Sequence, residues 1–468
     1  MARTSATSQF IRAAGLLIAV AFLLVLLSPR PALATPGFAR QTGVACEACH
    51  TVFPELTPFG RLFKLNGYVF SNVKQLQDIN TKRESTLSLG EIAPIGVQLQ
   101  ASNTTLAKTL PDAAVNDTSQ KNDTQFPQAL SIFYTGKISD NLGAFLQLTW
   151  NPSSNSVGID NSDLRFADHG DLSFMGSPDF IYGITLNNNP TSQDVWNSTP
   201  AWGYPFIVTN VGVPTNAHAQ IDGTLAQTSA GLGGYLYLFN HLYVEFSGYR
   251  SAQTGTTNSV TGNVGPLDST TANRLNGLAP YWRVAWQEDW QRNSLSFGTF
   301  GIRDVVHAKG IGEHGPANTF TDVAFDAQYQ YIGDDNIFSV YATYIHENQD
   351  LNTATGAAAN PTDRLNTARL TGSYFYERKY GGSLQIFSTT GTTDALLFAP
   401  APVVGSRKGK PDNQGAVVEL DYLPWLNTKL GVQYTAYNKF NGATSNYDGF
   451  GRHASDNNTL FVFIWTAF

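Results

Sequence analysis

The sequence predicts an all-β protein: an antiparallel β-barrel of the outer-membrane type, with about sixteen strands and a short N-terminal segment that acts as a plug. Three observations predict this class. From residue 85 onward, apolar and polar residues alternate with period two in many short runs. The connections between these runs are short and long in turn. Charged residues make up only 14% of the chain, against about 25% in soluble globular domains.

The N-terminus has the features of an export signal. Arg3 and Arg12 give a basic start, and residues 13–27 form an almost unbroken apolar run. Residues 32–34, Ala-Leu-Ala, supply a small-x-small cleavage pattern. Residues 1–34 are therefore predicted to be a signal peptide that is cleaved after export through the Sec pathway. An uncleaved anchor is the alternative, but the apolar run is shorter than the roughly 20 residues that a helical membrane span needs.

The balance of charge narrows the possible partners. Without the three arginines of the predicted signal, the net charge of −7 becomes −10. A surface with this sign disfavours a nucleic-acid partner. No later stretch matches the first apolar run in length, so no helical membrane span is predicted beyond the signal.

The chain has two cysteines, and both lie just behind the predicted signal. Cys46 and Cys49 are followed at once by His50, which is the attachment pattern of a c-type haem. This spacing lets the two thiols bond to the two vinyl groups of one porphyrin while the imidazole reaches the iron. A thioredoxin-like dithiol lacks its βαβ context here, and a zinc knuckle needs more ligands nearby. We therefore expect one covalent haem, with two thioether anchors and a proximal histidine.

Residues 35–84 form the predicted monohaem segment. With about 50 residues, the segment is near the size at which a chain no longer supports a core of its own. It contains no Met, and His50 is its only histidine, so the distal ligand of the iron stays unknown. Candidates for this ligand on predicted turns elsewhere in the chain are His169, Met175 and His241.

Two basic residues follow the haem motif. Arg61 and Lys64 are candidates to neutralise the haem propionates. A solvated basic pair that faces the lumen is an equal alternative.

Residues 85–468 form the predicted porin-like barrel. The alternating runs give sixteen strands, and bacterial barrels have an even number of strands. The predicted strands are 85–103, 128–138, 142–150, 160–168, 179–187, 231–239, 241–250, 281–289, 294–303, 321–332, 337–347, 367–377, 382–390, 414–422, 428–438 and 458–468.

The distribution of residue types over the two faces distinguishes a barrel from a soluble sandwich, which also alternates. In the run 321–332, Phe325 lies on an apolar face and Asp326 and Gln328 lie on a polar face. Aromatic residues such as Tyr134 and Tyr344 end apolar faces, as the interfacial girdles of membrane barrels do. The chain ends on an aromatic residue, which resembles the outer-membrane insertion signal, although Thr466 stands where that signal usually has Tyr.

The connections fall into two sets. Short turns are predicted at 139–141, 169–178, 240–241, 290–293, 333–336, 378–381 and 423–427, and we assign them to the periplasmic side. Long loops, among them 104–127, 188–230, 251–280 and 391–413, are assigned to the outside. A sixteen-stranded barrel encloses an aqueous lumen. A haem inside that lumen could serve a donor beyond the apolar band, which is about 25 Å tall.

Two of the outer loops carry further candidate residues. Loop 188–230 contains the aromatic residues Trp196, Trp202, Tyr204 and Phe206, and we expect it to fold into the lumen and meet the haem segment.

The loop between the predicted strands 294–303 and 321–332 contains His307, Glu313 and His314, which resemble a metal-capturing set. A solvated loop is the more ordinary reading of this stretch.

The haem motif and its surroundings resemble a known family. Residues 38–68, "FARQTGVACEACHTVFPELTPFGRLFKLNGY", followed by a porin-like barrel, are similar to the fused outer-membrane cytochrome–porins of iron-oxidising bacteria. The matching positions are Cys46, Cys49, His50, Pro54, Leu56, Phe59, Gly60, Phe63, Lys64, Gly67 and Tyr68, together with the barrel stretch 186–206.

This resemblance implies a function. The single haem would accept electrons from extracellular Fe(II) and pass them to a periplasmic c-type cytochrome or cupredoxin, which would make the chain an Fe(II)-oxidising cytochrome. Two alternatives stay open. One is a conduit for another donor or acceptor, such as reduced sulfur or outward metal reduction. The other is a diffusion porin whose haem motif is vestigial.

Overall fold

The computed structural model describes residues 37–70, 94–111, 119–152, 155–172, 177–252, 274–307 and 315–468. The predicted signal peptide lies outside the described residues, and so do Met175, Glu313 and His314. None of the helices in the described ranges is long and apolar enough to cross a membrane.

The described residues form one antiparallel sheet of 17 strands. The strands are β1 (Ile95–Pro111), β2 (Ser119–Ser139), β3 (Leu142–Asn151), β4 (Ser156–Leu172), β5 (Ser177–Asn187), β6 (Ser229–Leu238), β7 (Leu242–Ser251), β8 (Arg274–Leu275), β9 (Ala279–Trp290), β10 (Asn293–His307), β11 (Ala317–Ile332), β12 (Asn336–Asp350), β13 (Thr362–Tyr376), β14 (Tyr380–Gly391), β15 (Asn413–Trp425), β16 (Thr428–Lys439) and β17 (Thr459–Ala467).

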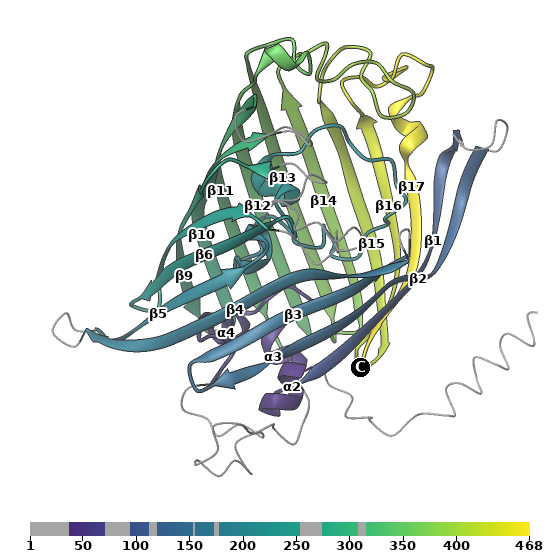
Figure 1. The fold of residues 1–468 in the computed structure, drawn as a ribbon. Helices are drawn as coiled ribbons and strands as arrows, with labels where there is room; N and C mark the ends of the chain where they lie inside the picture. The colour runs from purple at the N-terminus through teal and green to yellow at the C-terminus, as the bar shows by residue number, and fades with distance from the viewer. Residues whose placement is uncertain are drawn as a thin grey trace, which may run out of the picture. The chain divides into compact units, whose positions relative to one another are not determined.

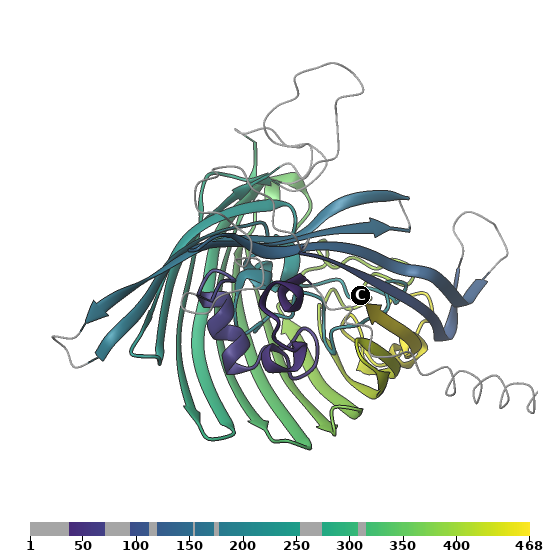
Figure 2. The same cartoon turned by 90° about the horizontal axis from the view of Figure 1, so that it is seen from below.

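The sheet closes into a barrel. β1 pairs with β17 as well as with β2, in a register that sets Gln98 opposite Ala467 and Leu106 opposite Thr459. β8 is a two-residue piece that pairs with the end of β10. Without β8, sixteen long strands follow one another around the ring. The predicted sixteen-stranded antiparallel barrel is confirmed (Figures 1 and 2).

The side chains divide between the two faces as the alternation predicts. On β11, Phe325 is 57% exposed on the outer face, while Asp326, Gln328 and Gln330 are at most 8% exposed on the inner face. The outer face is apolar along the other strands too, and Leu370 and Leu420 are examples. An apolar exterior around a polar interior is the architecture of a transmembrane barrel and the reverse of a soluble sandwich.

The strand boundaries agree with the predictions to within about five residues except near the first hairpin, and the predicted start of the first strand, residues 85–93, lies outside the described residues. Residues 104–127 were expected to form a loop, and this prediction is wrong for most of the stretch, because β1 continues to Pro111 and β2 begins at Ser119. Cross-strand hydrogen bonds hold this polar extension, such as Asn103 Nδ2 to Asn122 Oδ1 at 2.8 Å. The alternation of apolar and polar residues did not predict this extension, because a polar hairpin beyond the apolar band has no apolar face and so shows no alternation.

The short turns lie at one end of the barrel. Two residues join β9 to β10, three join β11 to β12 and three join β13 to β14. The connections at the other end are longer, apart from the four residues between β3 and β4, and the longest fully described one is residues 188–228. The predicted alternation of turn lengths is therefore confirmed. The C-terminus and the N-terminal helices lie at the short-turn end (Figure 1).

The N-terminal segment lies inside the ring (Figure 2). It contains the helices α2 (Gly37–Thr42), α3 (Cys46–Cys49) and α4 (Pro58–Leu65). α4 begins where the Thr57 side chain accepts a hydrogen bond from Gly60 N, with proline at the first helical position. The segment is the plug that the sequence predicts, because its side chains contact the inner wall at many points.

The connection 188–228 also runs through the lumen. It contains α5 (Pro190–Gln193) and a short helical turn, η3 (Gln220–Thr224). Three wall arginines hold the connection. Arg165 Nη2 donates to Gln193 O at 2.9 Å, Arg283 Nε lies 3.1 Å from the Asp194 carboxylate, and Arg369 pairs with Asp222.

Candidate functional site

The Cys-x-x-Cys-His motif forms a compact turn inside the barrel. α3 carries both cysteines as free thiols, and His50 N donates to Cys46 O at 2.9 Å. The chain then folds back, so that Thr57 N donates to Cys49 O at 2.9 Å and the Thr57 hydroxyl donates to Ala48 O at 2.6 Å. These bonds fix the two thiols and the imidazole relative to one another.

Gly60 lets α4 pack directly against α3. A Cβ atom at this position would lie 2.2 Å from Cys49 O and 3.0 Å from Cys49 Cα. Both neighbours are backbone atoms, which cannot swing aside as a side chain can. The glycine therefore places the first turn of α4 against the cysteine helix.

Cys46, Cys49 and His50 line one cavity of about 530 Å³. This volume lies within the range of about 300–1,000 Å³ that is typical of ligand sites. Most of the lining is apolar, and its aromatic members include Phe38, Phe63, Phe70, Phe133, Trp202 and Trp465. Residues of the short turns after β13 and β15 border the cavity as well, so it lies near the short-turn end. A large, flat, apolar group suits this lining.

The ionisation of the three motif residues suits a haem better than a reactive dithiol. Burial lowers the pKa of His50 to about 4, so the ring is neutral near pH 7, and its Nδ1 is buried without a hydrogen-bond partner. A neutral imidazole is the form that binds a metal. Burial, and then the charge of Cys46, raises the pKa of Cys49 to about 11. A thioredoxin-like dithiol has a lowered thiol pKa instead.

Arg61 does not line the cavity of Cys46, Cys49 and His50, which is called the haem cavity below after the cofactor that the sequence predicts. Arg61 is also buried, so the predictions of a propionate partner and of a solvated residue facing the lumen are both wrong for it. Its guanidinium donates to the side chains of Gln287 and Ser294 at 2.9 Å and to those of Gln328 and Gln330 at 3.0 Å. A fifth bond joins it to a carbonyl of the plug itself, Leu56 O. Each of the three guanidinium nitrogens therefore has at least one acceptor. Arg61 is the anchor that joins the plug to the barrel wall.

Lys64 does line the haem cavity. Its Nζ donates to Ser192 O at 2.5 Å, and Ser192 belongs to the connection 188–228. Burial, and then the charge of Arg165, lowers the pKa of Lys64 to about 8. Of the two basic candidates, Lys64 alone is placed to meet a group in the cavity.

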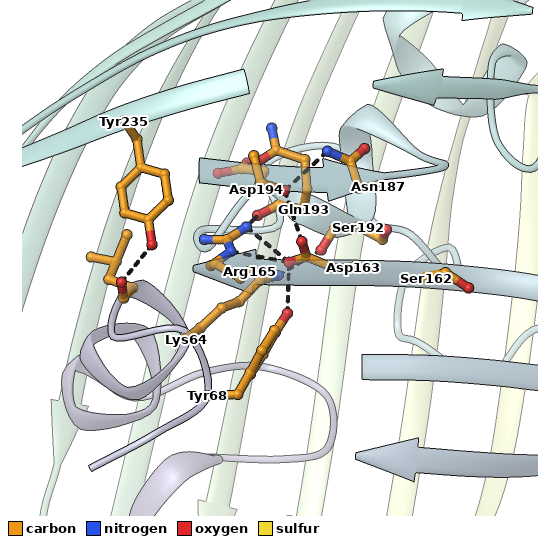
Figure 3. Close-up of polar contacts among 12 residues, drawn as sticks. Lys64, Tyr68, Ser162, Asp163, Arg165, Asn187, Ser192, Gln193, Asp194 and Tyr235 are labelled. Atoms are coloured by element: carbon orange, nitrogen blue, oxygen red, sulfur yellow. Dashed lines mark hydrogen bonds and ion pairs between the residues drawn. The ribbon is translucent and has the colours of Figure 1, made fainter. Parts of the chain in front are cut away.

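The plug and the connection 188–228 meet in the lumen, as expected (Figure 3). Besides the bond from Lys64, Tyr68 donates to the Asp163 carboxylate at 2.7 Å, and the same carboxylate pairs with Arg165 at 2.9 Å. Tyr235 donates to Leu65 O at 2.6 Å. Because Arg165 also holds Gln193 O, one buried network joins the plug, the wall and the connection.

Neither of the distal-ligand candidates that can be placed lines the cavity of Cys46, Cys49 and His50. His241 stacks on Trp286 at 5.1 Å and its Nδ1 lies 3.0 Å from Gln287 O, and it does not line the haem cavity. His169 is exposed near the end of β4 and is not part of the lining either. Among the described residues of the lining, His50 is the only histidine and there is no methionine.

The metal-capturing set cannot be assembled from what is placed. His307 is buried on β10 with its Nδ1 3.2 Å from Pro316 O. Within the described ranges, no group of three or more His, Cys, Asp or Glu residues is arranged to hold a metal ion.

The sequence patterns do not single out Glu55, which is buried at 3% exposure close to the Cys-x-x-Cys-His motif. It stands within the stretch 53–56, Phe-Pro-Glu-Leu, between two positions of the family match. A carboxylate placed among apolar residues could have indicated this buried position, because a buried acid needs hydrogen-bond or charge partners.

The fold and the site together define a class: an outer-membrane, porin-like β-barrel whose lumen contains a plug with a Cys-x-x-Cys-His sequence. No protein-family model matches the chain, and no curated protein matches it. Solved structures that resemble it include a loop-deletion mutant of OmpT, an outer membrane protein of Vibrio cholerae, at 12% identity and a TM-score of 0.44. That match covers 80% of this chain and 98% of the other.

Two channel structures are similar to the same extent. The outer membrane channel DcaP of Acinetobacter baumannii has 13% identity and a TM-score of 0.43, over 80% of this chain and 96% of its own. An anion-selective porin from Comamonas acidovorans has 15% identity and a TM-score of 0.42, over 80% and 98%. Similarity at this level carries no argument about function. The fold assignment stands on the strand pairing itself.

Proposed function

We propose that this chain is an outer-membrane electron conduit of the cytochrome–porin kind, which accepts electrons from extracellular Fe(II) through one covalent haem. The observation that carries the proposal is that Cys46, Cys49 and His50 open into one apolar cavity inside the lumen. A plain diffusion channel has no need of a haem-attachment motif buried in its pore. A haem supplies one-electron exchange at its iron when it is bound in such a site.

The residues around the cavity have separable roles in this proposal. The two cysteines would hold the porphyrin through thioether bonds, and His50 would offer its imidazole nitrogen to the iron. Lys64 offers a positive charge to a propionate, and the aromatic lining excludes water. The short turns after β13 and β15 border the same cavity. A periplasmic c-type cytochrome or cupredoxin that docks at this end of the barrel would therefore be close to the haem.

The test uses outer-membrane vesicles that contain the full chain. A pyridine haemochrome spectrum should report one haem per chain, and added Fe(II) should reduce that haem within the vesicles. The matched control is the double variant Cys46→Ala, Cys49→Ala, which should insert as a barrel and carry no covalent haem. Retention of covalent haem by this variant, or absence of haem from the wild type, rejects the proposal.

One observation favours the diffusion porin as the second candidate. A vestibule of about 580 Å³, with a lining that is half polar, lies on the far side of the connection 188–228. Single-channel conductance separates the two functions. The conduit predicts low conductance that rises when the plug is deleted, and the porin predicts solute flux through the intact chain.

The third candidate function is a conduit for a different donor or acceptor. It requires the same haem but a different reduction potential. Reduction by a sulfur donor, with no reduction by Fe(II), would support it.

A further inference from the structure

The C-terminal half of the connection 188–228 is fixed to the barrel wall through η3. In this turn, Gln220 N donates to Glu347 Oε2 and Ile221 N donates to Asp322 Oδ2, each at 2.7 Å. The residue before the turn supplies no side-chain cap, so carboxyl groups of the wall satisfy these two amides instead. This contact between η3 and the two carboxyl groups is called the latch below.

The two carboxyl groups of the latch lie directly opposite one another. Asp322 of β11 and Glu347 of β12 are register partners in the sheet, and both are fully buried on its inner face. Their side chains come within hydrogen-bonding distance of each other. Two ionised carboxylates can only accept hydrogen bonds and repel each other at such a distance. The closed latch therefore holds a proton between Asp322 and Glu347.

No positive charge takes the place of this proton within the described ranges. No basic residue there acts on Asp322 or Glu347. The guanidinium of Arg369, on β13, is bonded to Asp222 through both of its terminal nitrogens. A third acid, Asp304 of β10, acts on the same pair, is 1% exposed and has no hydrogen-bond partner for either oxygen. A buried group of acids without a cation favours the protonated form.

Apolar packing holds η3 against the wall as well. Ile221 is 1% exposed and belongs to one buried cluster with Leu225, Phe300 and Ile302. Burial of these side chains favours the closed position. The latch therefore stays closed as long as its two carboxyl groups do not repel each other.

We propose that the latch is operated by pH, and that it opens when alkaline solution removes the proton that Asp322 and Glu347 share. Loss of this proton leaves two carboxylates opposite each other on neighbouring strands. The sheet holds the two backbones in place, so the side chains have to turn apart to relieve the repulsion. Gln220 N and Ile221 N then lose their acceptors, and η3 leaves the wall.

Opening frees only one half of the connection 188–228. The N-terminal half stays in place, because Arg165 and Arg283 bind it near Gln193 and Asp194. The freed half borders the outer vestibule, so its movement widens the lumen on that side. This inference goes beyond the proposed function, and it requires no haem.

The direction of the pH effect follows from the proton balance. The closed latch holds one proton, and the open latch releases it, because the separated carboxyl groups meet lumen water and ionise as ordinary acids. A state that binds an extra proton is favoured at low pH and loses population as the pH rises. With one proton, the ratio of open to closed latch increases about tenfold per pH unit above the transition.

The other charged groups around the latch do not reverse this direction. The ion pair of Arg369 with Asp222 persists in alkaline solution and resists opening at any pH above the acidic range. His218 acts on Asp222 and gains its charge only in acidic solution. Repulsion from Asp304 adds to opening in alkaline solution, because Asp304 is an acid as well.

The direct test is hydrogen exchange at the amides of Gln220 and Ile221 in the full-length protein. Rates are measured from about pH 5 to about pH 10 and divided by those of an unstructured peptide at the same pH. Protection should be constant at low pH and fall about tenfold per pH unit above the transition. Glu347→Gln should abolish the fall, because its amide donates to Asp322 without a shared proton. A merely structural Glu347 predicts lower protection at every pH instead.

Two control variants should keep the wild-type profile. Glu419→Gln changes an acid that is equally buried, but Lys429 donates to it at 2.6 Å and supplies the charge that the latch lacks. His218→Gln removes the histidine next to the latch. Protection in wild type that does not depend on pH overturns the proposal. A wild-type fall that persists in Glu347→Gln overturns it as well.

Single-channel conductance gives a second measure. Wild-type conductance should rise over the same pH interval in which protection falls, while Glu347→Gln stays at the low value. If Glu347→Gln does not fold, Asp322→Asn makes the same change on the other partner. Conductance that stays constant in wild type across this interval rejects the opening of the lumen.

Discussion

Gly60→Ala is the most direct test of how the plug supports the haem site. The added methyl would lie 2.2 Å from Cys49 O, and ordinary contact begins at 3.4 Å, so α4 and α3 must separate by about 1.2 Å. Overpacking of this kind costs about 1–3 kcal/mol. We expect a value near 3 kcal/mol, because the opposing atoms are backbone and cannot rotate away.

The assay compares the fraction of chains that carry covalent haem with the protease resistance of residues 37–70. Gly60→Ala should lower both, while the barrel itself stays folded. Gly158→Ala is the matched control, because a Cβ at Gly158 meets no atom within 4 Å. Full haem content and an undisturbed plug in Gly60→Ala would refute the contact between α4 and α3.

Three further predictions follow from the anchors and the topology. Arg61→Met leaves four wall side chains without their donor, at a cost on the order of 1 kcal/mol for each bond, so the plug should release and channel conductance should rise; unchanged conductance contradicts the anchor. Lys64 has a folded pKa of about 8, below its ordinary 10.5, so the free energy of unfolding should rise from pH 8 to 10.5 relative to Lys64→Met; parallel pH profiles contradict its burial. Epitope tags in residues 392–412 should be accessible on intact cells, and tags in residues 291–292 should not. The reverse pattern would show that the short turns, and not the long loops, face the outside.

The sequence by itself determined the barrel. In a transmembrane barrel each strand pairs only with its neighbours, and the membrane imposes one rule on every strand, apolar outside and polar inside. Because that rule acts on residues two apart, it can be read locally, and strands such as β11 and β12 were placed to within a few residues. The Cys-x-x-Cys-His spacing is equally local, and the covalent haem that it predicts stays a prediction.

The tertiary structure alone decided which charged residues border the cavity that Cys46, Cys49 and His50 line. Arg61 and Lys64 are three residues apart on α4, and nothing local distinguishes them. The partners of Arg61 lie on β9, β10 and β11, more than 200 residues away in the chain. Glu55 is a similar case, since the Gln330 and Ser339 side chains that donate to its carboxylate come from β11 and β12, more than 200 residues away in the chain.

The last strand shows where the local rule stops. In β17, Leu460, Val462 and Ile464 face outward, as the alternation predicts. The intervening residues are apolar as well, and the pattern alone offers no reason for them. Trp465 stacks on Phe53 of the plug at 5.3 Å, and Phe461 packs in the same cluster with Ile207 of the connection 188–228. An inner face becomes apolar where other parts of the chain cover it, and that covering depends on contacts between distant segments, which only the folded structure brings together.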